Sequence, residues 1–356
     1  MSLEVSQKIQ IERAGNSRIG EVDFENLPFG RYPTDHMLVC DYADGKWTAP
    51  KIIPYQNISL DPSAKIFHYG QSVFEGMKAY KDGEGKVWLF RPLENQKRLN
   101  LSAKRLAMPE FPEELFMEGL NTLLKLDRDW VPTTKDSSLY IRPFIFASGN
   151  GFHASPSDKY TLVIACSPSG PYFGGKVKVL IEQKYSRAAN GGVGFAKAGG
   201  NYAGSFYPMK LAMEKGYQQV IWTDDTTHEY IEEAGAMNIF VRLGDTLVTA
   251  PVSDRILDGV TRKSIIDLAK DQGIPTEVRR ISVKEVVAAA ENGDLKEMFG
   301  AGTAAVISPI AGFGYQDRDF ELPQLEETYA AKLKKQITDI QYNRAEDKFG
   351  WRYEVR

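Results

Sequence analysis

The chain has 356 residues, of which 42% are hydrophobic and 26% are charged, and its formal net charge at pH 7 is −3. This length allows a large core and ordinarily two domains, while the near-neutral charge indicates neither a nucleic-acid partner nor binding to an anionic membrane. The N-terminus is polar where a secretion signal needs apolar residues, and no apolar run approaches the roughly 20 residues of a membrane span. We therefore expect a cytoplasmic protein without a membrane partner.

Hydrophobic patterns and turn signals predict a mixed α/β first half. The strand over 36–42 precedes a turn signal at Asp44-Gly45, and Asp82-Gly83 marks a second turn between two further strands. The other elements expected in this half are strands over 77–81, 86–90, 138–147 and 160–166, and helices over 92–107 and 112–126. The Pro- and Gly-rich stretch 167–175 is the candidate linker.

The second half begins with a predicted strand, and again strands and helices mix. The elements expected here are strands over 176–182, 219–223, 237–242 and 246–249, and helices over 204–215, 261–271, 283–291 and 324–341. We therefore predict a small α/β domain in residues 1–169, a linker over 170–175 and a larger domain over 176–356.

Residues able to bind a metal are few and dispersed. Only two cysteines occur, Cys40 and Cys166, and the four histidines lie far apart without an HExxH motif. This pattern gives neither a disulfide framework nor a thiolate zinc site, so we expect no metal. The composition is typical of an enzyme or of a large binding protein.

Lys197 is isolated in the stretch GGVGFAKAGGNYAGS. It is the only Lys, Arg, Asp or Glu between Ala188 and Met209. A lysine commonly lies on apolar surface along its stem and keeps its ammonium in water. Alternatively it is a Schiff-base nucleophile, because desolvation favours the neutral amine and small neighbours let a flat cofactor approach the backbone. Only the second interpretation explains the Ala-Gly-Gly that follows Lys197.

Pyridoxal phosphate would require three further kinds of group, and each has a candidate. Its ring nitrogen needs a carboxylate, for which Glu233 in EEAGAMNIF is available, and Tyr202 can reach the ring hydroxyl. Its phosphate needs an arginine and a helix N-terminus, which Arg91 in WLFRP and Val260-Thr261 in LDGVTRKS offer. Singly, these residues are equally typical of solvated carboxylates and surface ion pairs.

Together, the motifs resemble the branched-chain amino acid aminotransferases of the fold-type IV pyridoxal phosphate enzymes. The resemblance runs from Phe29 to Tyr342. The motifs are FGRYPTDHM, FHYGQSVFEGMKAY, FRP, YIRP, SGPYF, YSRAANGGVGFAKAGGNY, EEAGAMNIF, LDGVTR and GAGTAAV. It implies a smaller α/β N-terminal domain, a larger pseudobarrel domain that binds pyridoxal 5′-phosphate, and a homodimer. It also implies reversible amino transfer between L-leucine, L-isoleucine or L-valine and 2-oxoglutarate, with glutamate and the branched 2-oxo acids as the other substrates.

The resemblance assigns the cofactor residues. Lys197 carries the cofactor as a Schiff base and moves the proton between the substrate Cα and cofactor C4′. Glu233 pairs with the ring nitrogen and Tyr202 with the ring hydroxyl. The residues that hold the phosphate or lie near the cofactor are Arg91, Arg187, Val260, Thr261 and Thr303.

The resemblance also supplies a pocket that must accept both aliphatic side chains and the distal carboxylate of glutamate. The aromatic wall consists of Phe29, Phe74, Tyr140 and Tyr172, and Tyr69 enters from a partner subunit. Arg142 binds the distal carboxylate, and Thr303 and Ala304 offer backbone N–H groups to the substrate carboxylate. Tyr140 and Arg142 are two residues apart and therefore share one face of a strand. The alternative for the aromatic residues is a place in the core.

Three features set this chain apart or could mislead. The segment GAGTAA (300–305) matches the dinucleotide fingerprint, but β-branched residues and Pro309 follow it, so we expect a strand instead of a helix. Ala305 and Ser308 stand where redox-regulated relatives carry a CxxC. Phe152 and Ala154 occupy a loop that reaches the partner's pocket in the family, where we expect aliphatic residues.

Two other functions are weighed against this one. Another fold-type IV enzyme, such as a D-amino acid transaminase or aminodeoxychorismate lyase, would lack the Tyr140-x-Arg142 pair and the long FGRYPTDHM segment. A non-catalytic binding protein of the same fold would not need Lys197, Glu233 and Arg91 together.

Overall fold

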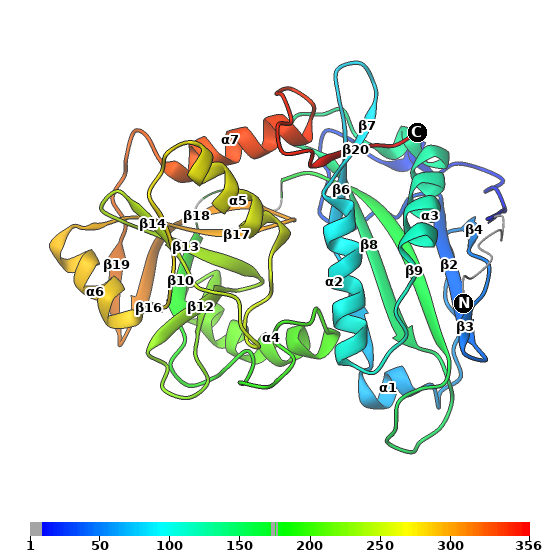
Figure 1. The fold of residues 1–356 in the computed structure, drawn as a ribbon, viewed down its shortest axis with the longest axis horizontal. Coiled ribbons are helices and arrows are strands. Elements are labelled where there is room, and N and C mark those ends of the chain that lie inside the picture. The colour runs from blue at the N-terminus through cyan, green and yellow to red at the C-terminus, as the bar shows by residue number, and fades with distance from the viewer. Residues whose placement is uncertain (1–8, 172–174, 176) are drawn as a thin grey trace. The chain divides into compact units, whose positions relative to one another are not determined.

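The computed structural model describes residues 9–171, 175 and 177–356, which fall into two compact units (Figure 1). The first comprises the described residues up to 171, with Ala196–Gly199 and Gln341–Arg356. The second comprises the described residues up to 195, with Gly200–Ile340. The division into domains at 170–175 stays a prediction.

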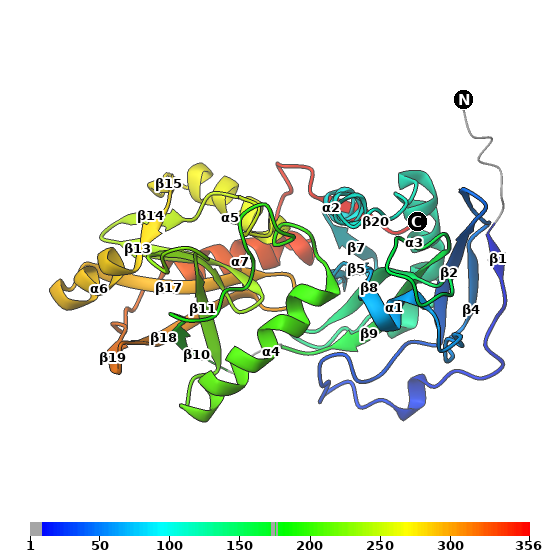
Figure 2. The same ribbon diagram turned by 90° about the horizontal axis from the view of Figure 1, so that it is seen from below.

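The first unit is built on a ten-stranded sheet with the central order β1-β4-β2-β9-β8-β6-β7-β20, in which β3 pairs with β2 and β5 with β8. All of these pairings are antiparallel except that of β1 with β4, and Figure 2 shows β1, β4 and β2 next to one another. The strands are β1 (Gln10–Ile11), β2 (His36–Ala43), β3 (Lys46–Trp47), β4 (Lys51–Pro54), β5 (Ser72–Phe74), β6 (Met77–Lys81), β7 (Val87–Phe90), β8 (Ser138–Ala147), β9 (Tyr160–Ser169) and β20 (Arg352–Glu354).

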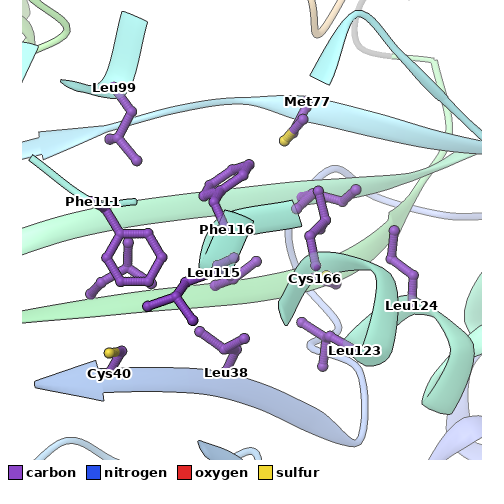
Figure 3. Packing of buried hydrophobic residues seen from close by; sticks show 14 of the residues in the cluster. Leu38, Cys40, Met77, Leu99, Phe111, Leu115, Phe116, Leu123, Leu124 and Cys166 are labelled. Atoms are coloured by element: carbon purple, nitrogen blue, oxygen red, sulfur yellow. The ribbon is translucent and has the colours of Figure 1, made fainter. Parts of the chain in front are cut away.

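Helices α2 (Pro92–Arg105) and α3 (Glu113–Leu126) cover one face of this sheet, and α1 (Lys65–Tyr69) is a short helix beside β8. Pro92 at the first position of α2 is favourable because that residue needs no intrahelical N–H bond. Their apolar faces form a core with the strands, in which Leu99, Phe116 and Leu38 are buried (Figure 3). Two 3₁₀ turns, Ile19–Glu21 and Arg128–Trp130, complete the unit.

The second unit contains a closed barrel. Its ten-stranded sheet has the order β15-β14-β13-β17-β18-β10-β11-β12-β16, and β19 pairs with β18. An additional pairing of β12 with β13 closes six strands, β13-β17-β18-β10-β11-β12, into a ring. The strands are β10 (Val177–Ile181), β11 (Gln219–Thr223), β12 (Tyr230–Ala234), β13 (Met237–Leu243), β14 (Thr246–Thr249), β15 (Thr276–Val278), β16 (Ile281–Ser282), β17 (Leu295–Gly302), β18 (Val306–Tyr315) and β19 (Arg318–Glu321). The barrel confirms the expected mixed αβ fold with a pseudobarrel.

The remaining helices are α4 (Gly199–Glu214), α5 (Val260–Asp271), α6 (Val283–Asn292) and α7 (Tyr329–Gln341). Helices α5 and α6 pack against β17. Ser282 caps α6 by accepting the Glu285 N–H at 3.0 Å. Among the described residues, every helix is too short or too polar to span a bilayer.

Three predicted boundaries are wrong. Helix α4 begins at Gly199 instead of 204, because glycine in a first turn loses no intrahelical N–H bond. Helix α7 begins at Tyr329 instead of 324, because the Glu297 carboxylate accepts the N–H groups of Tyr329 and Ala330. Strand β9 continues to Ser169, so part of the stretch that we took as a linker is sheet.

Candidate active site

The backbone of Lys197 is held firmly in the first unit. Its N–H donates to the Ser102 Oγ at 2.9 Å, and its carbonyl accepts the Phe74 N–H at 3.0 Å. Ala198 forms a bridge to Val73, and a Cβ on Gly199 would lie 2.8 Å from the Ser72 hydroxyl. The small residues after Lys197 therefore let this segment lie directly against β5.

The Phe74 ring contacts two cations. The Lys197 Nζ lies 4.9 Å from its centroid and the Arg142 Cζ 4.7 Å. Both distances are within the range of favourable cation–π contacts. Arg142 also lies over Tyr140, 5.2 Å from the ring centroid, and donates from Nη2 to the Tyr140 hydroxyl at 2.9 Å. Phe29 meets Tyr140 edge-on with centroids 4.7 Å apart, so the structure brings these four predicted pocket residues together with Lys197.

Gly76 is a residue of this group that sequence reasoning missed. A Cβ at this position would lie 2.2 Å from the Tyr140 hydroxyl oxygen. Any larger residue would displace the tyrosine hydroxyl and with it the guanidinium of Arg142. The glycine stands in the FEG motif, but its purpose becomes visible only once β6 is paired with β8.

A second missed set is a buried polar stripe on α2. Asn95, Arg98 and Ser102 share one helical face and are buried. Arg98 binds both oxygens of the fully buried Glu75, at 2.7 and 2.9 Å, and Asn95 donates to the same carboxylate at 2.8 Å. Burial raises the pKa of Glu75, but the charges of Arg98 and Lys197 and the hydrogen bonds from Arg98 and Asn95 hold it below the ordinary value. A buried negative charge therefore lies within electrostatic range of Lys197.

Arg91 occupies the junction between β7 and α2, at the N-cap position of the helix. Its backbone has φ +49°, which is uncommon for a residue other than glycine. Its side chain is largely buried and lies 4.0 Å from the Glu94 carboxylate.

In the second unit, Glu233 lies on β12 and is buried among donors. Its Oε2 pairs with the Arg187 Nε at 2.7 Å, and its Oε1 accepts from the Leu257 N–H at 2.8 Å and from Asn238 Nδ2 at 3.2 Å. Arg187 also donates to the carbonyls of Gly194, at 2.9 Å, and of Arg255. Arg187 therefore orients Glu233 and holds the chain before Lys197 in one arrangement.

Val260 and Thr261 are the first residues of α5, as predicted from LDGVTRKS. The N-cap residue, Gly259, makes no side-chain cap, so no side chain of that residue uses the N–H groups at the start of the helix. A Cβ on Gly259 would lie 1.9 Å from the Asn238 Oδ1, which links this turn to the residues around Glu233. Such a helix start is suited to a phosphate.

Thr303 and Ala304 lie in the turn between β17 and β18, and both are half-buried. Val306, which begins β18, has φ +60°, a rare conformation for a β-branched residue. The strand that follows the turn confirms that GAGTAA does not open a helix, so it is not a dinucleotide fingerprint.

The other predicted residues are placed as follows. Tyr202 lies on α4 in the second unit and is half-buried. Tyr69 lies at the end of α1, and its hydroxyl donates to the Phe152 carbonyl. Phe152 is 72% exposed. Tyr172 lies outside the described residues.

The donor set fits pyridoxal phosphate. The second unit holds a buried carboxylate for a ring nitrogen and a helix start for a phosphate, and the first unit holds an amine and an arginine. Within the described part of the chain, no three His, Cys, Asp or Glu side chains are placed to bind a metal ion.

Comparison with known proteins first defines the class. The family model described as "Amino-transferase class IV" matches residues 72–313, about two thirds of the chain. The probable branched-chain-amino-acid aminotransferase of Staphylococcus epidermidis is 46% identical over 357 residues, which cover 99% of each chain. The branched-chain-amino-acid transaminase 1 of Bacillus subtilis is 46% identical, with 94% of this chain and 95% of the relative covered.

Solved structures agree. A branched-chain amino acid aminotransferase from T.th., crystallised with pyridoxamine 5′-phosphate, matches with a TM-score of 0.72 and 25% identity, covering 89% of this chain and 98% of that chain. The chain therefore belongs to the class IV aminotransferases and, among them, to the branched-chain-amino-acid aminotransferases. This family membership confirms the resemblance and the expectation of a pyridoxal phosphate-dependent enzyme.

We predict that this enzyme has no thiol switch. Ala305 and Ser308 cannot form a disulfide, and Cys40 and Cys166 are both buried and free. Burial raises the pKa of Cys40 to about 12 and that of Cys166 above its ordinary value, so near pH 7 both stay in the inert thiol form. Mild peroxide should leave the initial rate nearly unchanged, and dithiothreitol should not raise it. A large loss that dithiothreitol restores, and that Cys40→Ser or Cys166→Ser prevents, would contradict this prediction.

Proposed function

We propose that the protein catalyses reversible amino transfer between L-leucine, L-isoleucine or L-valine and 2-oxoglutarate, with pyridoxal phosphate held on Lys197. The observation that carries the proposal is the Phe74 ring, which lies 4.9 Å from the Lys197 amine and 4.7 Å from the Arg142 guanidinium. One aromatic wall thus adjoins both an amine suited to the chemistry and a cation suited to the distal carboxylate of glutamate.

When bound, pyridoxal phosphate supplies an aldehyde that condenses with amines and a ring that accepts electrons. The residues of this chain hold it and handle the proton. Lys197 would hold the cofactor covalently and, once the substrate amine has displaced it, would take the proton from the substrate Cα. Because Ser102 and Phe74 hold its backbone, only the side chain of Lys197 needs to move.

Glu233 and the phosphate-binding groups have distinct tasks. Arg187 favours the charged form of the Glu233 carboxylate, which suits contact with a protonated ring nitrogen. Tyr202 would bind the ring hydroxyl. The groups proposed to hold the phosphate are Arg91, the N–H groups of Val260 and Thr261, and Thr303.

The pocket would discriminate between substrates by polarity. Phe29, Phe74 and Tyr140 give an aromatic surface for aliphatic side chains, while Arg142 offers a charge-assisted contact to glutamate. The N–H groups of the Thr303–Ala304 turn would bind the carboxylate that all the substrates share. We place Tyr172 in the same wall from the family resemblance alone.

A panel of amino donors tests the function. Purified enzyme is supplied with 2-oxoglutarate and with the L- or D-enantiomer of leucine, isoleucine or valine, and glutamate formation is measured. We expect turnover with the three L-enantiomers only. Turnover of D-leucine alone would favour a D-amino acid transaminase, and a protein without bound cofactor or turnover would favour a binding protein.

Arg142→Met should separate the two kinds of substrate. The variant loses a charge-assisted hydrogen bond to glutamate and 2-oxoglutarate but no contact with leucine, so KM should rise about 10- to 100-fold for the first two only. The measurement is the ratio of kcat/KM for glutamate to that for leucine. Tyr140→Phe is the control, since it removes the hydroxyl that accepts from Arg142 and keeps the guanidinium. Equal losses for both substrates would indicate a structural role.

We also propose that the enzyme is a cytoplasmic homodimer. Phe67, Tyr69 and Phe152 are exposed aromatic residues of the first unit, which supports a contact with a second copy that would include Tyr69. The two free cysteines are typical of a reducing compartment. Light scattering of the purified protein measures the first point, and cell fractionation the second.

A further inference from the structure

The C-terminal strand is paired to the strand that leads into Arg91. Strand β20 runs antiparallel to β7, with Arg352 opposite Phe90 and Glu354 opposite Trp88. Continued by one residue, this register places Trp351 opposite Arg91, and the Arg91 N–H donates to the Trp351 carbonyl at 2.7 Å. Residues about 260 positions apart in the chain are thus joined at the N-cap of α2.

The Trp351 side chain supports the guanidinium as well. The Arg91 Cζ lies 5.0 Å from the Trp351 ring centroid, a cation–π distance. Phe349 stacks on Trp351 with centroids 4.3 Å apart and planes at 9°, and Phe90 meets it edge-on at 5.6 Å. Trp351 is therefore fixed in place and buried, and it presents a rigid aromatic surface to the arginine.

The backbone of Arg91 also needs support. Its left-handed conformation is unfavourable for a residue with a Cβ, and Pro92 disfavours the right-handed helical region for the residue before it. The hydrogen bond to the Trp351 carbonyl holds this conformation. Both the backbone and the side chain of Arg91 are thus oriented by the same C-terminal residue.

We propose that Trp351 is a positioning residue for the phosphate of the cofactor, acting through Arg91. The inference rests on the proposed function, in which Arg91 binds that phosphate. An arginine held in its binding conformation loses less side-chain entropy when the anion arrives, and this raises affinity without a contact between Trp351 and the cofactor. The effect is specific to ligands that carry a phosphate.

The test compares two cofactors that differ only in the phosphate. The full-length enzyme is loaded with pyridoxal phosphate or with pyridoxal, and the apparent dissociation constant of each is measured by cofactor release on dilution. We expect Trp351→Leu to weaken retention of pyridoxal phosphate about tenfold and to leave that of pyridoxal unchanged. Trp351→Phe should lose less, because it keeps an aromatic surface. Trp88→Leu is the matched control, since it removes a tryptophan from the same strand pair, where it contacts Arg352, and should leave the ratio unchanged.

Failure of the inference and failure of the proposed function give different results. If Arg91→Ala leaves the ratio of the two dissociation constants unchanged, Arg91 does not bind the phosphate and the proposed function is wrong at this residue. If Arg91→Ala lowers the preference for pyridoxal phosphate but Trp351→Leu does not, the inference alone is overturned. An equal loss for both cofactors in Trp351→Leu also overturns it. If Trp351→Leu does not fold, Phe349→Leu removes the stacked ring and keeps the tryptophan, and a wild-type ratio in both this variant and Trp351→Phe contradicts the proposal.

Discussion

Lys197→Ala should abolish amino transfer between L-leucine and 2-oxoglutarate. The substitution removes both the covalent attachment of the cofactor and the group that moves the substrate proton. Proton transfer by a positioned side chain alone typically contributes about 10²- to 10⁴-fold to a rate, so the combined loss should exceed that range. Alanine keeps the backbone hydrogen bonds to Ser102 and Phe74, and we expect the variant to fold. The measurement is the initial rate together with the violet absorbance of the bound cofactor, which should disappear.

Lys210→Ala is the control for this experiment. Lys210 lies on α4 with an exposed side chain and a long contact of 3.9 Å to Glu214. Its removal should leave both the rate and the absorbance unchanged. If Lys197→Ala retained most of the wild-type rate, another lysine would have to carry the cofactor.

Glu233→Gln should lower kcat about 10- to 100-fold while the cofactor stays bound. A hydrogen bond to a charged group contributes about 1.5–3 kcal/mol, and its loss weakens the ring as an electron acceptor. Glutamine keeps the shape of the side chain and an oxygen that can accept from Leu257 and Asn238. Glu233→Ala should lose more, because it also leaves the buried Arg187 without its carboxylate, which typically costs about 3–5 kcal/mol of stability.

The neighbouring glutamate offers a matched control. Glu232 is also buried on β12, faces the opposite side of the strand and pairs with Arg255 at 2.5 Å. Glu232→Gln should lower stability with little effect on kcat, as measured by thermal unfolding and steady-state kinetics. An unchanged kcat in Glu233→Gln, or an equal loss in both variants, would contradict the role assigned to Glu233.

Local signals predicted the elements whose ends are marked within a few residues. The turn at Asp82-Gly83 and Pro92 at the start of α2 are such signals, and the strand over 138–147 is found with the expected bounds. The start of α7 was misplaced because Glu297, which accepts its first N–H groups, lies on a distant strand. Strand β20 is short and gains its partner only when β7 is in place, so no local pattern indicates it.

The candidate site divides in the same way. Lys197 could be singled out because its apolar, glycine-rich surroundings are visible in the sequence itself, and the family motifs supplied the pocket residues. Glu75, Gly76 and Ser102 were missed because their roles depend on contacts made by the fold. A polar stripe of Asn95, Arg98 and Ser102 alongside the apolar Leu99 and Ala103 was the available signal, since polar residues on a buried helical face need partners.

Borohydride reduction of the holoenzyme, followed by peptide mass spectrometry, tests the central claim most directly. Reduction fixes the cofactor to the lysine that carries it, so the modified residue can be located without relying on activity. The account predicts a single pyridoxyl-modified site, at Lys197, which is lost when an amino donor such as L-leucine is added before reduction. Modification of a different lysine, or modification at Lys197 that L-leucine does not diminish, would contradict it.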